Sequence, residues 1–194
     1  MKFSDMRRFI LIDSLVLFLL LLAFYFDHRI SVLVSLIRNS ILDNFFMGIT
    51  FVSSILIVFL FLTLLFVREN KRKWILPLWV TLVANVIVGF LLKVVVQRQR
   101  PYQLELVSVA QGLAENAHKV WDFSFPSFQA MMVFCAVPLL SKEFPKFKYV
   151  WVIFACLVAF SRVYLGVHFL SDVIAGALIG YMIGYFIMRN VEGK

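Results

Sequence analysis

Long apolar runs, separated by short polar segments, dominate the sequence. Because about 20 apolar residues are needed to cross a bilayer, we expect six transmembrane helices, at residues about 9–26, 45–67, 74–96, 126–140, 149–164 and 168–188. Residues 97–125 form a long polar loop, and the mixed polar and apolar residues of 28–44 predict a helix on the membrane surface. The pattern therefore predicts one all-α integral membrane domain over residues 1–194.

Composition excludes an ordinary soluble domain. The chain is 62% hydrophobic and 15% charged, with a mean hydropathy of +0.93, whereas soluble domains carry about 25% charged residues. The formal net charge of +8 does not indicate nucleic-acid binding, because the basic residues lie mostly at the ends of the apolar runs. Cys135 and Cys156 both lie within apolar runs and form no disulfide framework.

The distribution of Lys and Arg predicts the orientation in the membrane. Most of these residues fall in the two chain ends and in the segments 68–73 and 141–148, which become cytoplasmic if the N-terminus is cytoplasmic. We therefore expect a multi-pass protein of the cell membrane with both termini inside and the loop 97–125 on the outer face. Gly176, Gly180 and Gly184, spaced by four residues, would permit close helix packing or simply be small residues in a membrane helix.

Polar residues that carry chemistry collect at the predicted outer face. Lys93 and Arg100 are seven residues apart, so they would share one face if the third helix continued to Pro101. Arg98 would be rotated off that face, toward lipid headgroups or solvent. Ser127 would begin the fourth helix, where free N–H groups and the helix dipole favour an anion.

The last two spans add the remaining groups. Ser161 and Arg162 end the fifth span, and His168 opens the sixth with Asp172 one turn later on the same face. An imidazole is a nucleophile that a carboxylate can orient through its other nitrogen. Together with Lys93 and Arg100, these residues predict a phosphate site that needs no metal and no cofactor, because the sequence has no carboxylate cluster for Mg²⁺.

Three short motifs resemble those of a known family. They are Lys93-x6-Arg100-Pro101, then Pro126-Ser127, then Ser161-Arg162-x5-His168 with Asp172. In this order they resemble the signature motifs of the type 2 phosphatidic acid phosphatase superfamily, membrane lipid phosphatases related in their core to vanadium haloperoxidases. The resemblance implies a lipid phosphatase/haloperoxidase-like helical bundle. It also implies a membrane lipid as substrate: phosphatidic acid, phosphatidylglycerol phosphate, or an isoprenyl mono- or diphosphate.

The resemblance assigns a role to each matching residue. The phosphate would be held by Lys93, Arg100, Arg162 and Ser127. His168 would attack phosphorus to form a phosphohistidine, Asp172 would orient His168, and water would then release phosphate. These roles imply a phosphoric ester or diphosphate hydrolase.

The second motif departs from the family. Where the family has Pro-Ser-Gly-His, this chain has Pro126-Ser127-Phe128-Gln129, so the histidine that protonates the leaving oxygen is replaced by Gln129. A diphosphate substrate would make this acid dispensable, or His118 of the outer loop would replace it. Alternatively, the protein is a non-catalytic lipid-phosphate binder or transporter on the same scaffold. Gln129 and Ser161 remain accessory candidates for contact with the bound phosphate.

Overall fold

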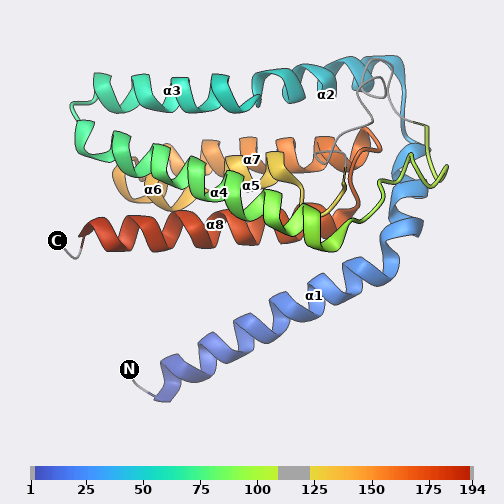
Figure 1. Cartoon of the computed structure of the whole chain (residues 1–194), viewed down its shortest axis with the longest axis horizontal. Coiled ribbons are helices and arrows are strands. Elements are labelled where there is room, and N and C mark those ends of the chain that lie inside the picture. Colours follow the sequence, from blue (N-terminus) through green and yellow to red (C-terminus); the bar gives the residue numbers. More distant parts are fainter. Residues whose placement is uncertain (1–2, 109–122, 193–194) are drawn as a thin grey trace.

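The computed structural model describes residues 3–108 and 123–192, and within these ranges the protein is helical without strands. Figure 1 shows the elements in sequence colours. Their bounds are α1 (Phe3–Ser35), α2 (Ser40–Val52), α3 (Ile55–Arg68), η1 (Arg72–Trp74), α4 (Ile75–Val96), α5 (Phe128–Phe134), α6 (Val137–Glu143), α7 (Lys148–Tyr164) and α8 (Leu170–Glu192).

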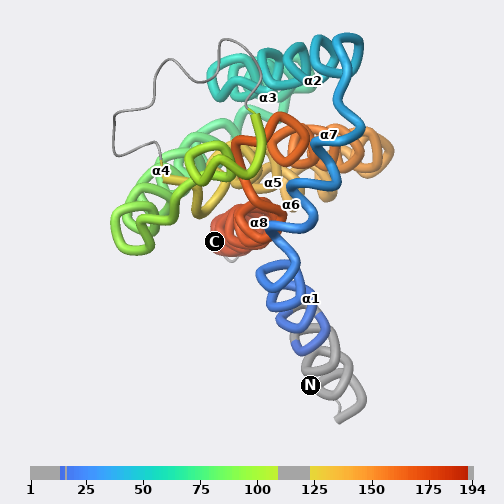
Figure 2. The backbone as a smooth tube through the Cα atoms, turned by 90° about the vertical axis from the view of Figure 1, so that its right-hand side faces the viewer, coloured from blue at the N-terminus to red at the C-terminus, as the bar shows by residue number. Residues whose placement is uncertain are grey.

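The bundle is built around the short helices α5 and α6. Helices α3, α4, α7 and α8 run lengthwise around them, and α5 packs most extensively against α8 (Figure 1). Helix α1 contacts α7 and α8 of this bundle. Toward its N-terminal side it leads away from the bundle (Figure 2). The helices and the segments that join them therefore surround a common centre.

The distribution of polarity is that of a membrane protein. Large apolar side chains cover the outside, among them Leu64, Val95 and Val150, with exposed fractions of 68%, 78% and 58%. Polar side chains such as Asp27 and Lys93 are instead buried at 1% and 2% exposure. Exposed apolar side chains and buried charged side chains are unfavourable for a protein in water and favourable for a protein surrounded by lipid.

Three helices in the described part of the chain are long and apolar enough to cross a membrane, at Leu17–Ser35, Arg72–Val96 and Leu170–Val191. Helices α2 and α3 make a fourth candidate if they are counted as one bent span. Helix α7 has 17 residues, and α5 and α6 have 7 each. The chain is thus an all-helical membrane protein with three to four candidate spans, and the six-span count stays a prediction.

The predicted surface helix over 28–44 is wrong. Helix α1 continues through the first part of this segment to Ser35, and α2 begins at Ser40. Asn39 ends the intervening turn, and its side-chain oxygen accepts hydrogen bonds from the N–H groups of Ile41 and Leu42 at 3.1 and 3.0 Å. This N-cap starts a new helix, so the segment is divided between two helices.

The predicted span 45–67 is broken between α2 and α3, which meet at 57°. In a continuous helix the Thr50 carbonyl would accept from the N–H of residue 54. Here it accepts instead from Ser53 Oγ at 3.1 Å and from Gln129 Nε2 at 3.0 Å, while the Ser54 N–H donates to Phe51. Side chains thus replace the helical bonding and bend the segment.

Close packing of α8 against α5 confirms the first interpretation of the glycine spacing. A Cβ atom on Gly176, Gly180 or Gly184 would lie 2.5, 2.2 or 2.0 Å from the carbonyl oxygens of Ser127, Met131 and Cys135, respectively. The backbones can approach this closely only because the glycines carry no side chain. This contact fixes the start of α5, and with it the second motif, against α8.

Candidate active site

A cavity of about 420 Å³ lies where α4 ends and α5 and α8 begin. The start of α1 and the end of α8 lie on the opposite side of the bundle from the start of α8 (Figure 1). The cavity is lined by Thr50, Ser54, Ile55, Lys93, Arg100, Phe128, Gln129, Arg162 and His168. Three cations and an imidazole from separate segments therefore surround one space.

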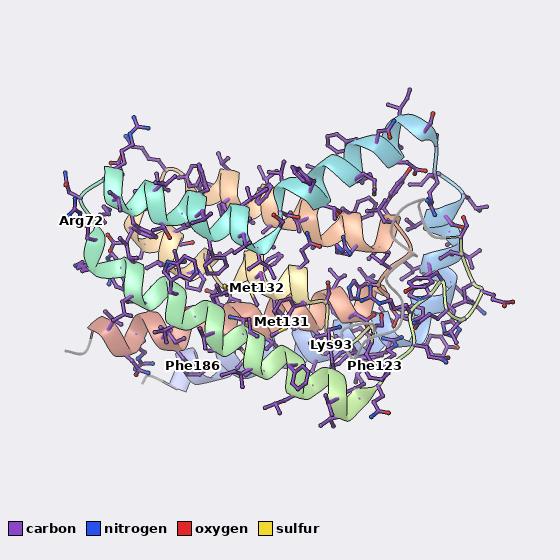
Figure 3. The ribbon with its side chains drawn as sticks, turned by 45° about the horizontal axis from the view of Figure 1, so that its top comes forward. Arg72, Lys93, Phe123, Met131, Met132 and Phe186 are labelled. Carbon is purple, nitrogen blue, oxygen red and sulfur yellow. The ribbon has the colours of Figure 1, made fainter. Side chains whose placement is uncertain are left out.

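Lys93 and Arg100 both line the cavity, but not as one helix face. Helix α4 ends at Val96, and Gln97 adopts a left-handed conformation with φ of 48°, so the expectation of a helix that continues to Arg100 is wrong. Lys93 is buried, and its ammonium group donates to the carbonyl of Phe123, beside it in Figure 3. Arg100 Nη1 donates to the carbonyl of Val167 at 3.2 Å. These contacts aim two positive charges into the cavity.

Arg162 brings a third positive charge from the end of α7. Its guanidinium is buried, and Nη1 donates to Thr50 Oγ1 at 3.1 Å. Its Nε is also buried and has no hydrogen-bond partner within the described ranges. Since a buried N–H group without an acceptor is costly, this atom can donate to an acceptor that enters the cavity.

His168 follows the turn at Gly166, whose φ of 75° favours glycine. The turn folds the chain back so that the His168 N–H donates to the Arg162 carbonyl at 3.2 Å. Nδ1 of His168 lies 3.5 Å from Ser124 Oγ and 3.9 Å from Asp172 Oδ2. Nδ1 thus faces Ser124 and Asp172 in the interior of the bundle. The other ring nitrogen, Nε2, lies on the other side of the ring.

The pKa of the His168 imidazole is lowered to about 3. Burial is the main cause; the charges of Arg100 and Lys93 act in the same direction, and the carboxylate of Asp172 opposes them. His168 precedes the candidate span Leu170–Val191. Its imidazole is therefore neutral at physiological pH and retains a lone pair for nucleophilic attack.

Asp172 lies behind His168 and does not line the cavity. Its carboxylate is fully buried and accepts hydrogen bonds from the Ser124 hydroxyl, the Phe169 N–H at 2.8 Å and Arg98 Nη1 at 2.7 Å. The exposed position predicted for Arg98 is therefore wrong. The left-handed residue Gln97 redirects the chain after α4, so the helical rotation used for that prediction no longer applies.

Ser127 and Ser161 lie outside the cavity lining. The Ser127 N–H donates to the Asp172 carbonyl at 2.9 Å, and its hydroxyl is buried without a partner in the described residues. Ser161 Oγ donates to the Val158 carbonyl at 2.7 Å and lies 3.5 Å from Thr50 Oγ1. His118 lies outside the described residues.

Gln129 and Phe128 form the wall where the family has histidine and glycine. The Gln129 amide donates to the Thr50 carbonyl at 3.0 Å and to Ser53 Oγ at 2.5 Å. The Phe128 ring packs over Gly89 of α4, where a Cβ atom would lie 2.9 Å from the ring. The two departures from the family motif are thus accommodated by partners elsewhere in this chain.

Sequence reasoning missed several polar residues around the site: Asp27, Thr50, Ser53, Ser54 and Ser124. Each had a signal. Thr50 and the Ser53–Ser54 pair interrupt an apolar run, and Asp27 is a carboxylate at the end of another. Polar groups in membrane segments are rare enough to indicate function or buried pairing. Among the described residues, no group of three or more His, Cys, Asp or Glu is placed to hold a metal ion.

The fold and the cavity together define a class: helical membrane proteins whose bundle encloses a cationic, histidine-containing cavity. Residues 73–194 match the model of the PAP2 superfamily, and the chain belongs to this superfamily. The resemblance found in the sequence motifs, and the enzyme class that it implies, are therefore confirmed at the level of the family.

Individual relatives extend this similarity. The undecaprenyl-diphosphatase of Sulfolobus acidocaldarius is 34% identical over 123 residues, which are 63% of this chain and 57% of that protein. The undecaprenyl-diphosphatase BcrC of Bacillus subtilis is 26% identical over 153 residues, 78% of this chain and 76% of the relative. A crystal structure of a transmembrane PAP2-type phosphatidylglycerolphosphate phosphatase from Bacillus subtilis has a TM-score of 0.70 and 27% identity. That match covers 93% of this chain and 95% of the other.

Proposed function

We propose that this protein is a membrane lipid phosphatase that hydrolyses a lipid phosphate, preferably an isoprenyl diphosphate, through a phosphohistidine and without a metal. The observation that carries the proposal is the single cavity in which Lys93, Arg100 and Arg162 surround His168. Three positive charges neutralise a phosphoryl group, and each guanidinium can hold two of its oxygens.

His168 is the nucleophile in this proposal. Its Nε2 attacks the terminal phosphorus while the bond from phosphorus to the bridging oxygen breaks, and the electron pair leaves with that oxygen. Asp172 and Ser124, on the Nδ1 side of the ring, stabilise the positive charge that develops on the imidazole. Water then attacks the phosphohistidine, which releases inorganic phosphate and restores the imidazole.

Gln129 favours a diphosphate as the substrate. An amide cannot protonate a departing alkoxide, and general acid help is worth about 10²–10⁴ in rate. When the terminal phosphate of an isoprenyl diphosphate is transferred, the leaving group is isoprenyl monophosphate, which is stable as an anion and needs no proton. Two relatives named undecaprenyl-diphosphatase support this choice.

The lipid tail would occupy an apolar groove between α3 and α7. This groove, of about 310 Å³, is lined by Val52, Ile57, Val58, Phe61, Phe147, Val150, Trp151 and Phe154. It adjoins the break between α2 and α3, where Val52 lines the groove and Thr50 and Ser54 line the cavity. With six spans and both termini cytoplasmic, the headgroup site would lie at the outer face.

A second candidate function is binding or transport of a lipid phosphate without catalysis. The observation that favours it is the position of Gln129, which occupies the general-acid position and is bonded to Thr50 and Ser53. In this second function the cationic cavity would bind the lipid phosphate, and His168 would not act as a nucleophile.

Purified protein in detergent separates the two candidates. Phosphate release is measured from isoprenyl diphosphate, phosphatidate and phosphatidylglycerol phosphate, with His168→Ala as control and with a chelator in a parallel series. If the protein is a phosphatase, we expect turnover that the chelator does not change and that His168→Ala abolishes. Substrate labelled with ³²P should also yield a labelled protein whose label is lost in acid. Retained lipid binding with no turnover of any substrate would establish the binder instead.

A further inference from the structure

Arg98 lies at the centre of a buried charge network behind the cavity. Its Nη1 is 2.7 Å from Asp172 Oδ1 and its Nη2 is 2.7 Å from Asp27 Oδ2. Asp172 and Asp27 have side-chain exposures of 0% and 1%, and that of Arg98 is 20%. One guanidinium therefore bridges a carboxylate of α8 and a carboxylate of α1, a geometry that its planar fork permits and an ammonium group does not.

Aromatic rings and main-chain bonds hold the network in place. The Arg98 guanidinium lies over the rings of Phe169 and Phe24, at 4.1 and 5.0 Å from their centroids. The Ser171 N–H donates to Asp27 Oδ1 at 3.0 Å, and the Ser171 hydroxyl donates to Asp27 Oδ2. The charges are thus desolvated and fixed in direction, which strengthens their effect on neighbouring groups.

Arg98 also fixes Ser124. Its main-chain carbonyl accepts the Ser124 N–H at 2.7 Å. Ser124 donates its hydroxyl to Asp172 Oδ2 and lies 3.5 Å from His168 Nδ1. Both groups that face Nδ1 of the imidazole are therefore held by Arg98, one through its side chain and the other through its backbone.

We propose that Arg98 and Asp27 are positioning residues: they hold Asp172 and Ser124 as acceptors toward His168 Nδ1, so that the proton stays on Nδ1 and the lone pair on Nε2 faces the cavity. As far as turnover is concerned, the inference rests on the proposed phosphatase function. Asp27 acts through Arg98, which it keeps from turning wholly toward Asp172. Helix α1 is thereby coupled to the nucleophile although it contributes no residue to the cavity lining.

The tautomer of His168 tests this inference without any turnover. The chain has 3 histidines, so ¹⁵N-histidine labelling gives a simple imidazole spectrum, in which His168→Ala identifies the His168 signals. The folded protein is expected to show a protonated Nδ1 and an unprotonated Nε2. Arg98→Ala is expected to produce a mixture of both tautomers, and Arg98→Lys and Asp27→Asn a smaller shift. Arg29→Ala, an exposed cation on α1, should leave the spectrum unchanged.

Kinetics provide the second measurement. Loss of a residue that orients a directly acting group typically lowers activity by about 10–100-fold. Arg98→Ala should therefore lower kcat by this factor for each folded molecule, with KM changed less than about twofold. Lys93, Arg100 and Arg162 still bind the phosphate, so an effect confined to kcat separates positioning from loss of binding. Arg98→Lys should recover part of kcat because it keeps the charge. The amount of folded protein in each sample is measured by size-exclusion chromatography before the assay.

The outcomes distinguish this inference from the phosphatase proposal. Turnover by the unaltered protein, with the tautomer and the kcat of folded Arg98→Ala both unchanged, overturns the role of Arg98 and leaves the phosphatase intact. No turnover, with a tautomer that still depends on Arg98, rejects the phosphatase and supports the positioning role. If Arg98→Ala does not fold, Arg98→Lys and Asp27→Asn decide: an unchanged tautomer in both overturns the inference.

Discussion

The side-chain amide of Gln129 donates a hydrogen bond to the main-chain carbonyl of Thr50, 3.0 Å away, across the break between α2 and α3. In a continuous helix this carbonyl would be occupied by the backbone N–H four residues later. Gln129 therefore helps to hold the bend that brings Thr50 into the cavity wall. A residue at the family's general-acid position thus has a structural partner of its own.

Restoring histidine at position 129 should change the substrate preference. Gln129→His is expected to raise kcat/KM for phosphatidate by about 10²-fold, the lower range for general acid help, and to change isoprenyl diphosphate hydrolysis only a few-fold. Phosphate release from the two lipids measures the ratio. Gln129→Met, which keeps the length but lacks the amide, controls for the lost contact with Thr50. Equal acceleration of both substrates would reject our explanation of the departure.

Removal of the Thr50 hydroxyl should weaken substrate binding. Thr50 Oγ1 accepts a hydrogen bond from Arg162 Nη1 at 3.1 Å, and a bond to a charged group is worth about 1.5–3 kcal/mol. Thr50→Val should therefore raise KM about 10-fold or more with a smaller change in kcat. Thr63→Val, which removes a hydroxyl from α3 outside the cavity lining, is the matched control. If Thr50→Val leaves KM unchanged, the hydrogen bond to Thr50 is not needed to position Arg162.

A methyl group on Gly180 should destabilise the bundle. The new Cβ would lie 2.2 Å from the Met131 carbonyl oxygen, so α8 and α5 would have to separate. Overpacking of this kind costs about 1–3 kcal/mol, which thermal unfolding in detergent can measure. Gly48→Ala, where a Cβ meets nothing within 4 Å, should be neutral or stabilising, since alanine favours the helix. Equal stability of the two variants would contradict the close contact.

The stability of the fold should depend on pH through His168. Burial lowers its folded-state pKa to about 3, below the ordinary value of 6.5. The unfolded chain therefore binds the proton more strongly, and the stabilisation that is present above pH 6.5 is lost as pH falls toward 3. Between pH 7 and 5 the unfolding midpoint should fall in the unaltered protein and fall less in His168→Gln.

The exposed His28 offers the control for this measurement. His28→Gln should keep the pH dependence of the unaltered protein. The limiting slope for one such group is about 1.4 kcal/mol per pH unit. If His168→Gln and the unaltered protein lose stability in parallel over this interval, His168 is not buried in its neutral form.

Patterns inside a single helix were predictable from the sequence. Apolar run length predicted where helical segments lie, though not where they break, and the four-residue glycine spacing was compatible with a close helix contact, because periodicity is preserved as long as a helix continues. His168 precedes α8, whereas Asp172 lies in its first turn. The predicted proximity of the two side chains nevertheless holds, since His168 Nδ1 and Asp172 Oδ2 are 3.9 Å apart with Ser124 beside them. Lys93, Arg100 and Arg162 were identified by residue type and motif and do line one cavity.

The sequence by itself determined that the chain enters a membrane and which motif residues are the candidates for its chemistry, since hydrophobicity and residue type are local properties. The tertiary structure alone decided where the helices end and what lies behind the motifs. Gln97 turns left-handed and sends Arg98 inward, and the bend after α2 depends on Gln129, 79 residues away from Thr50. Such contacts join segments that are distant in the chain. Neither periodicity nor local propensity predicts which segments will meet.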